Sequence, residues 1–135
     1  MRPNSVVKRS TVVAIGGNAL LIEGQKGTIA EQIENALDMA RQLAKMIKLG
    51  WRVIVTHGNG PQVGFIVLRS DRSADVLPRL PLDICVADSQ GGIGYIVVDA
   101  LQTAMTELGL DATATAVLTR CVVDTADPAF ENPTK

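Results

Sequence analysis

The chain has 135 residues, enough for one domain with a single core and little more. Hydrophobic residues make up 47% of it and charged residues 20%, a balance typical of a folded globular chain and unlike that of a disordered one. A net charge of −1 gives no field to attract nucleic acid or an anionic membrane, so we expect neither partner. Phosphate binding, if present, must come from local backbone geometry and individual lysines.

Targeting and redox signals are weak. Residues 1–10 lack the apolar core of a secretory signal and are expected to be a flexible N-terminus, and no run of eighteen apolar residues occurs. Cys85 and Cys121 lack metal-ligand spacing and are expected to be reduced, buried thiols, with a disulfide between them as the alternative. These features favour a cytoplasmic location.

The first expected strand leads directly into a glycine loop. The apolar run Val12 to Ile15 is typical of a parallel strand covered on both faces, and Gly16, Gly17 and Asn18 follow it. A long helix should come next, because Thr28 to Glu31 has the capping-box form and Gly50 supplies a stop. Its apolar residues recur at helical spacing: Ile29, Ile33, Leu37, Ala40, Ala44 and Ile47.

A second loop of the same kind follows the strand expected at residues 51–56. Gly58, Asn59 and Gly60 lie there, and Pro61 suits the first position of a helix over residues 61–70. Glycines allow positive φ and a close approach of backbone N–H groups, and a helix N-terminus favours an anion. In a βαβ unit both loops emerge at one edge of the sheet, so we expect them to converge on one anionic ligand.

The remainder of the chain is read more coarsely. Residues 71–81 are expected to form a surface connection, and residues 82–108 two helical pieces, the second starting near Gly92, because three glycines interrupt the pattern. Residues 112–123 predict a third strand. The expected fold is a three-layer αβα domain with a mainly parallel sheet, covering residues 11–123, and residues 124–135 are expected to be a loop that leaves the domain.

Five blocks, in this order, resemble the amino-terminal half of a carbamate kinase, a member of the amino acid kinase family. They are IGGNAL at 15–20, HGNGPQVG at 57–64, PLD at 81–83 with Cys85, SQG at 89–91 with IGY at 93–95, and NPTK at 132–135. The resemblance implies phosphoryl transfer between ATP and carbamate, giving ADP and carbamoyl phosphate, with Mg²⁺ on the nucleotide. Members of the family are much longer than this chain, so we expect a fragment that lacks most of the nucleotide site and is inactive alone.

The same resemblance implies roles for particular residues. The two loops would hold the transferred phosphoryl group, through Gly16, Gly17, Asn18, Gly58, Asn59 and Gly60. Ser89, Gln90 and Gly91 would lie beside the carbamate pocket. Residues 124–135 would lead into a small protruding subdomain, from which Lys135 would act catalytically. Relatives that phosphorylate carboxylates carry a lysine at the position of Ala14, and carbamate kinases do not.

Three polar residues have competing interpretations. His57 could be a general base, but carbamate is already an anion, so we favour a hydrogen bond that shapes the loop. Asp83 and Asp88 could bind a metal, but single carboxylates more often cap helices. Asp88 also departs from the family pattern, and no complete protein metal site is visible.

The resemblance further implies a homodimer, to which residues 93–108 could contribute, and a place in arginine breakdown. Two alternatives remain open. One is a non-catalytic half-module that binds phosphate or acyl phosphate and needs a partner chain. The other is an amino acid kinase relative that acts on another small acid, which Ala14 and the NPTK block at 132–135 argue against.

Overall fold

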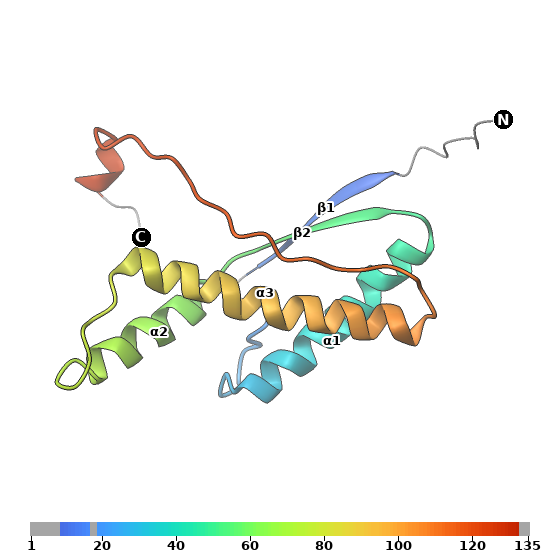
Figure 1. Ribbon diagram of the computed structural model, residues 1–135, viewed down its shortest axis with the longest axis horizontal. Helices are drawn as coiled ribbons and strands as arrows, with labels where there is room; N and C mark the ends of the chain where they lie inside the picture. Colours follow the sequence, from blue (N-terminus) through green and yellow to red (C-terminus); the bar gives the residue numbers. More distant parts are fainter. Residues whose placement is uncertain (1–8, 17–18, 133–135) are drawn as a thin grey trace.

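The computed structural model describes residues 9–16 and 19–132 (Figure 1). These residues form two strands and three α-helices, with a short 3-10 helix near the carboxyl end. In order they are β1 (Ser10–Ile15), α1 (Ile29–Lys48), β2 (Arg52–His57), α2 (Gly60–Arg72), α3 (Leu82–Glu107) and η2 (Pro128–Phe130).

The βαβ unit expected from the sequence is confirmed. β1 and β2 pair in parallel over their whole lengths, from Ser10 opposite Arg52 to Ile15 opposite His57. Helix α1 connects them and begins with the expected capping box. The Thr28 hydroxyl accepts a hydrogen bond from the Glu31 amide, and the Glu31 carboxylate accepts one from the Thr28 amide at 2.7 Å.

The inner face of α1 differs from the expected one. Ala40 and Ala44 are buried as expected, but Ile29 and Ile33 are exposed, and Gln32 takes the buried position near the helix start. The amide of Gln32 donates to the Gly27 carbonyl at 3.1 Å, so this polar side chain is paired inside the fold.

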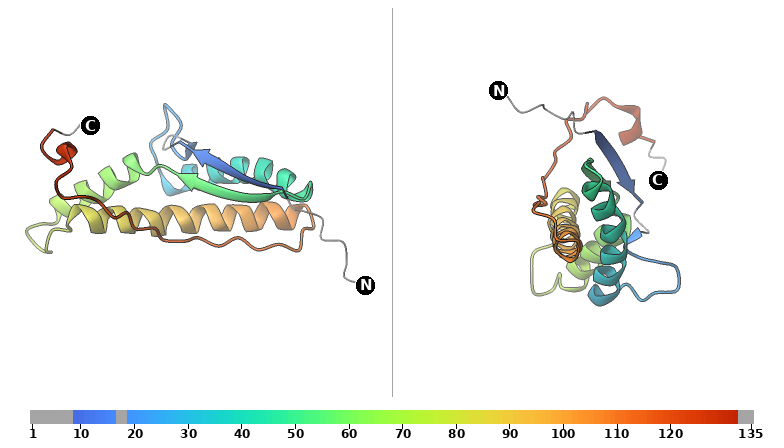
Figure 2. Two further views of the ribbon diagram at one scale, coloured as in Figure 1. Left: turned by 90° about the horizontal axis from the view of Figure 1, so that it is seen from above. Right: turned by 90° about the vertical axis from the view of Figure 1, so that its right-hand side faces the viewer.

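Helices cover one face of the two strands, and the expectation of two covered faces is wrong for the described residues. Val13, Val53 and Val55 pack against the core, whereas Val12 and Ile54, which point the other way, are 63% and 55% exposed. Figure 2 shows the sheet lying against the helical layer. The fold is therefore α/β with a parallel sheet, but the described part supplies two of the three expected layers.

Helix α3 is continuous, so the expected division near Gly92 is wrong. Gly91 and Gly92 have open space beside them, and Gly94 lies where the extended chain passes closely, since a Cβ there would meet the Ala116 Cβ at 3.0 Å. Each glycine costs about 1 kcal/mol of helix propensity, which packing of the whole helix against α1 outweighs. Gly109, with φ of 65°, follows the end of the helix as expected.

The third strand expected at residues 112–123 does not form. Residues 111–124 are extended but have no strand partner among the described residues, because the sheet there contains only β1 and β2. Both views show this segment running back along α3 (Figures 1 and 2). A strand needs a hydrogen-bonded neighbour as well as a suitable sequence. This segment has a suitable sequence but no such neighbour.

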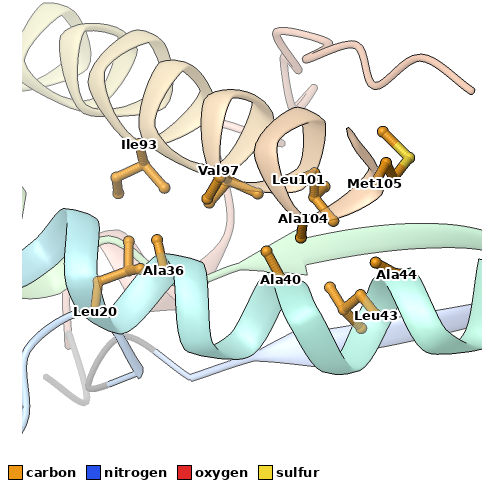
Figure 3. Packing of buried hydrophobic residues seen from close by; sticks show 11 residues of the cluster. Leu20, Ala36, Ala40, Leu43, Ala44, Ile93, Val97, Leu101, Ala104 and Met105 are labelled. Carbon is orange, nitrogen blue, oxygen red and sulfur yellow. The ribbon is translucent and has the colours of Figure 1, made fainter. Parts of the chain in front are cut away.

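The core lies between α1 and α3 (Figure 3). Ile93, Val97, Leu101 and Met105 of α3 are buried there, each of which contributes about 1.5–3 kcal/mol by burial. These side chains are buried in the chain's own core, so any contribution of residues 93–108 to a homodimer would come from the exposed side of α3, where Tyr95 lies. Helix α3 is also the one helix, among the described residues, with the length and hydropathy of a membrane span, and its apolar side is explained by this packing.

The cysteines are unpaired. Cys85 is buried as expected, but Cys121 is exposed, which corrects the expectation of two buried thiols. The alternative of a disulfide between them is not realised.

Candidate functional site

The structure brings the two glycine loops together. The Gly58 amide donates a hydrogen bond to the Ile15 carbonyl at 3.1 Å, so the chain leaving β2 lies against the residue that precedes Gly16. The Ala19 amide donates to the Gly16 carbonyl at 2.9 Å. Gly16 and Gly58 therefore both lie at the carboxyl edge of the parallel sheet, where α/β folds bind their ligands.

The second loop opens into α2 with a helix N-terminus that no side chain caps. Helix α2 begins at Gly60 with Asn59 as its N-cap residue, and the Asn59 side chain makes no capping hydrogen bond. Pro61 is the second helical residue and has no N–H, so the amides of Gly60 and Gln62 remain as donors. An uncapped helix start of this kind suits an anion, because the free donors and the helix dipole act together.

Gly16 and Gly60 do not adopt the backbone conformation that the sequence analysis expected. Gly16 and Gly60 have ordinary φ values, and a Cβ built on either meets nothing within 4 Å. The expectation that these loops need positive φ is wrong at both positions. The other reason expected for glycine still applies: without a Cβ, a ligand from outside this chain can approach the backbone N–H groups closely.

Asn59 is held by α3 through a short chain of hydrogen bonds. Its Nδ2 donates to the Ser89 Oγ at 2.8 Å, and that hydroxyl donates its single proton to the Val86 carbonyl at 2.6 Å. Ser89 is buried, so the pair is shielded from water. The sequence placed Ser89 near the site, and the structure gives it the task of orienting the Asn59 side chain.

The other predicted residues of this group lie differently. Gln90 is occupied by the extended segment, because its Oε1 accepts from the Thr119 amide at 2.9 Å and its Nε2 donates to the Thr119 carbonyl at 3.2 Å. Gly91 is exposed on α3 and makes no contact that ties it to the loops. Gly17, Asn18 and Lys135 lie outside the described residues.

His57 makes the loop hydrogen bond that the sequence analysis favoured. Its Nδ1 lies 3.1 Å from the Gly58 carbonyl, which can only accept, so Nδ1 carries a proton and donates it. In the neutral ring Nε2 is then an acceptor. This bond braces the loop at the residue that also contacts Ile15.

The carboxylates do not form a metal site. Asp83 lies in the first turn of α3, where it complements the helix dipole, and it is exposed. Asp88 is exposed and lines a small cavity of about 130 Å³ between the helices. Among the described residues no three His, Cys, Asp or Glu side chains gather closely enough to hold a metal ion.

Sequence reasoning missed Gln62, which lies directly after the second loop. Its Nε2 donates to the Gln32 Oε1 at 3.4 Å, and its Oε1 is buried with no partner among the described residues. The amide of Gln32 is fixed by the Gly27 carbonyl, so the whole chain of amides has one orientation. Gln62 thereby connects α2 to α1 beneath the loop. The signal available was a glutamine at a position of α2 that faces the other helices.

Comparison with family models gives no match. Individual relatives match strongly. The chain is 46% identical to the carbamate kinase of Pyrococcus horikoshii over 126 residues, which is 92% of this chain and 40% of that protein. It is 44% identical to the carbamate kinase of Lentilactobacillus hilgardii over 128 residues, again with 40% of the relative covered. The chain thus spans about two fifths of the length of the curated relatives it matches.

Solved structures agree with these relatives. The carbamate kinase from Giardia lamblia bound to AMP-PNP superposes with a TM-score of 0.92 and 40% identity, covering 96% of this chain and 45% of that one. The same protein bound to citric acid superposes with a TM-score of 0.91. Sequence identity and the shared fold together show that this chain is a homologue of part of a carbamate kinase, over about two fifths of its length.

Proposed function

We propose that this chain is the phosphoryl-binding part of a carbamate kinase, which transfers a phosphoryl group reversibly between ATP and carbamate to give ADP and carbamoyl phosphate. The observation that carries the proposal is the hydrogen bond of 3.1 Å from the Gly58 amide to the Ile15 carbonyl, which sets the two loops side by side. Homology to carbamate kinases supplies the reaction, since loop geometry alone fits many phosphate ligands.

In this proposal the loops position and stabilise charge. Phosphoryl transfer leaves negative charge on three equatorial oxygens, and preorganised N–H donors at Gly16, Gly58 and Gly60 would stabilise it without reorganising. Asn59, fixed by Ser89, would orient the substrate end. Among the described residues of the site, 16, 57–62 and 89, none is lysine or arginine. Positive charge would come from Lys135 and from Mg²⁺ carried on the nucleotide.

The proposal requires a partner for turnover. The chain matches 40% of the length of its relatives, and the described residues offer no carboxylate cluster that would hold a metal–nucleotide complex. We therefore propose that the chain binds phosphate or acyl phosphate and turns over only when the rest of a carbamate kinase accompanies it. A cytoplasmic homodimer in arginine breakdown remains the setting that we propose for the complete enzyme.

ATP formation from ADP, Mg²⁺ and carbamoyl phosphate tests this proposal. The purified chain alone should form no ATP above the uncatalysed background. The chain co-expressed with the unmatched remainder of the Pyrococcus horikoshii carbamate kinase should form ATP. Robust ATP formation by the chain alone would contradict the need for a partner. An assembled complex that forms no ATP would contradict the reaction itself.

A further inference from the structure

Gln62 carries a buried side-chain amide of which only one half is paired. It is the third residue of α2 and is 9% exposed. Its Nε2 donates to the Gln32 Oε1 at 3.4 Å, while its Oε1 accepts from no described residue. Turning the amide over would set two oxygen atoms against each other, because the Gln32 Nε2 already donates to the Gly27 carbonyl. The unpaired acceptor is therefore built into the fold.

This arrangement lowers the stability of the chain. A buried acceptor without a donor has lost its hydrogen bond to water and gained none in return. The apolar side chains of Phe65, Ile66 and Ile93 line the same small cavity as Gln62, so an apolar residue of equal length would suit the position. Buried polar atoms in folded proteins are nearly always paired, and departures from such rules are expected at functional sites. Gln62 is a departure of this kind.

The backbone of Gln62 belongs to the candidate site. The first hydrogen bond of α2 runs from the Val63 amide to the Asn59 carbonyl at 3.0 Å, so the amides of Gly60 and Gln62 have no partner within the helix. These two N–H groups point out of the helix start, where an anion is favoured. The Gln62 side chain is tied to α1 by the bond to Gln32. One residue thus connects the free donors to a second helix.

The far end of this connection is fixed by the segment that follows the first glycine loop. Gly27 has a φ of 76°, and a Cβ there would meet the Leu21 Cδ2 at 2.9 Å and the Phe65 ring at 3.4 Å. The carbonyl that holds Gln32 therefore lies in a closely packed turn, and Gln32 is itself buried. Through this chain of bonds, the start of α2 has a fixed relation to the polypeptide that leaves the first loop.

We propose that Gln62 is a positioning residue for phosphoryl transfer. Its side-chain amide, held by Gln32, fixes the orientation of the first turn of α2, so that the free amides of Gly60 and Gln62 point at the anion bound between the loops. The side chain does not itself touch the anion. The inference rests on the proposed function, which supplies that anion. A residue kept for packing alone would be apolar at this position.

Gln62→Met tests this role, because it keeps the length of the side chain and removes both polar atoms. The melting temperature should hold or rise, since no unpaired acceptor remains. Residual dipolar couplings of the amides at positions 60, 62 and 63 should change relative to those of α1. The Kd for inorganic phosphate, measured by NMR titration of the chain, should rise at least about fivefold, because the donors must lie within about 0.5 Å of the productive geometry.

Two further variants separate positioning from packing. Gln32→Met removes the other side of the same bond and leaves both polar atoms of Gln62 unpaired, so it should lower the melting temperature and raise the Kd. The double variant should recover stability and raise the Kd no further than either single change, because both changes break one connection. Gln42→Met is the matched control on the exposed face of α1, and it should change neither the couplings nor the Kd.

Each outcome decides the proposal. Dipolar couplings of Gln62→Met that match those of the parent chain would overturn it, and so would a clearly lower melting temperature of that variant. Increases in Kd that add in the double variant would also overturn it. Failure of the parent chain to bind phosphate would contradict the proposed function instead. The dipolar couplings need no ligand, so they would still show whether Gln62 orients the first turn of α2.

Discussion

At the scale of single residues, the site depends on backbone N–H groups and space that the chain's own side chains leave unoccupied. Asn59 directs its side chain to Ser89 and leaves the start of α2 without a cap, and His57 braces the loop through the Gly58 carbonyl. The packing of the chain does not require glycine at positions 16 and 60, since the space beside each is open. We therefore assign that space to a ligand.

Gly60→Ala tests this assignment. The added methyl group clashes with nothing in the chain and reduces the freedom of the unfolded state, so stability should hold or rise by up to about 1 kcal/mol. The kcat for ATP formation by the reconstituted complex should nevertheless fall at least about tenfold, because the methyl group would keep the phosphoryl oxygens away from the Gly60 amide, and an oxyanion donor that is not used costs roughly 10² to 10³ in comparable sites.

Gly64→Ala is the matched control for that change. Gly64 also lies in α2 with open space beside it, four residues further along the helix. Thermal unfolding should show a similar gain in stability for both variants, whereas the kcat should remain unchanged in Gly64→Ala. Equal activity of the two variants would show that no ligand approaches Gly60.

At the scale of elements, two carboxylates tie helix ends in place. Hydrogen bonds from Arg41 hold the pKa of Glu107 below its ordinary value, and the Thr28 amide does the same for the pKa of Glu31. The first bond joins α1 to the end of α3 in a bidentate pair with both distances at 3.0 Å. The second is the capping box of α1.

Acid titration tests these contacts. Both pKa values are lower in the folded state than the ordinary value of 4.5, so the stability they provide is complete above that pH and is lost as pH falls through the lowered values. Melting temperature should therefore drop below about pH 4.5. Glu31→Gln and Glu107→Gln should each make the drop shallower, and salt should weaken only the contribution of Glu107. An unchanged acid limb in both variants would contradict this interpretation.

Helix α3 offers a second test at this scale. Gly92→Ala should stabilise the chain by up to about 1 kcal/mol, since its surroundings are open. Gly94→Ala gains the same propensity but presses on Ala116, and crowding of this kind costs about 1–3 kcal/mol. Urea unfolding should rank Gly92→Ala above the parent chain and Gly94→Ala below Gly92→Ala. A reversed ranking would contradict the close approach of the extended segment.

The sequence was informative where local chemistry decides the structure. The capping box at Thr28, Gly50 after α1 and the glycine loops each carry a local signal, and β1, α1, β2 and α2 were predicted with bounds close to those observed. Helix α3 was divided wrongly because glycine signals a break only when tertiary packing does not outweigh it. The third strand was expected from composition, but ladder pairing depends on a neighbour that residues 112–123 do not have here.

The site could be predicted in outline and not in detail. Adjacent loops follow from βαβ topology, so Gly16 and Gly58 could be placed together before any coordinates. That Ser89 orients Asn59, that Gln90 instead binds Thr119, and that Gln62 lies buried beneath the loop depend on how α3 packs. Side-chain partners separated by about thirty residues leave no periodic signal in the sequence.

At the scale of the whole molecule, the described part of the chain is a helical layer with a two-stranded parallel sheet packed against it. Val12 and Ile54 remain exposed on the open face, and Val117, Leu118 and Val122 are exposed along the extended segment. Exposed apolar side chains of this number are typical of an interaction surface. The paired loops, by contrast, need only β1, β2 and the start of α2, so their anion binding should persist in the chain alone.

Titration of the isotope-labelled chain with inorganic phosphate, followed by NMR, tests the central claim most directly. The amides of Gly16, Gly58 and Gly60 should shift together along one binding curve with a single Kd, while those of Gly64 and Gly92 stay in place. Shifts confined to one loop, two distinct binding curves, or no shift at any of the three glycines would contradict the claim that both loops hold one anion.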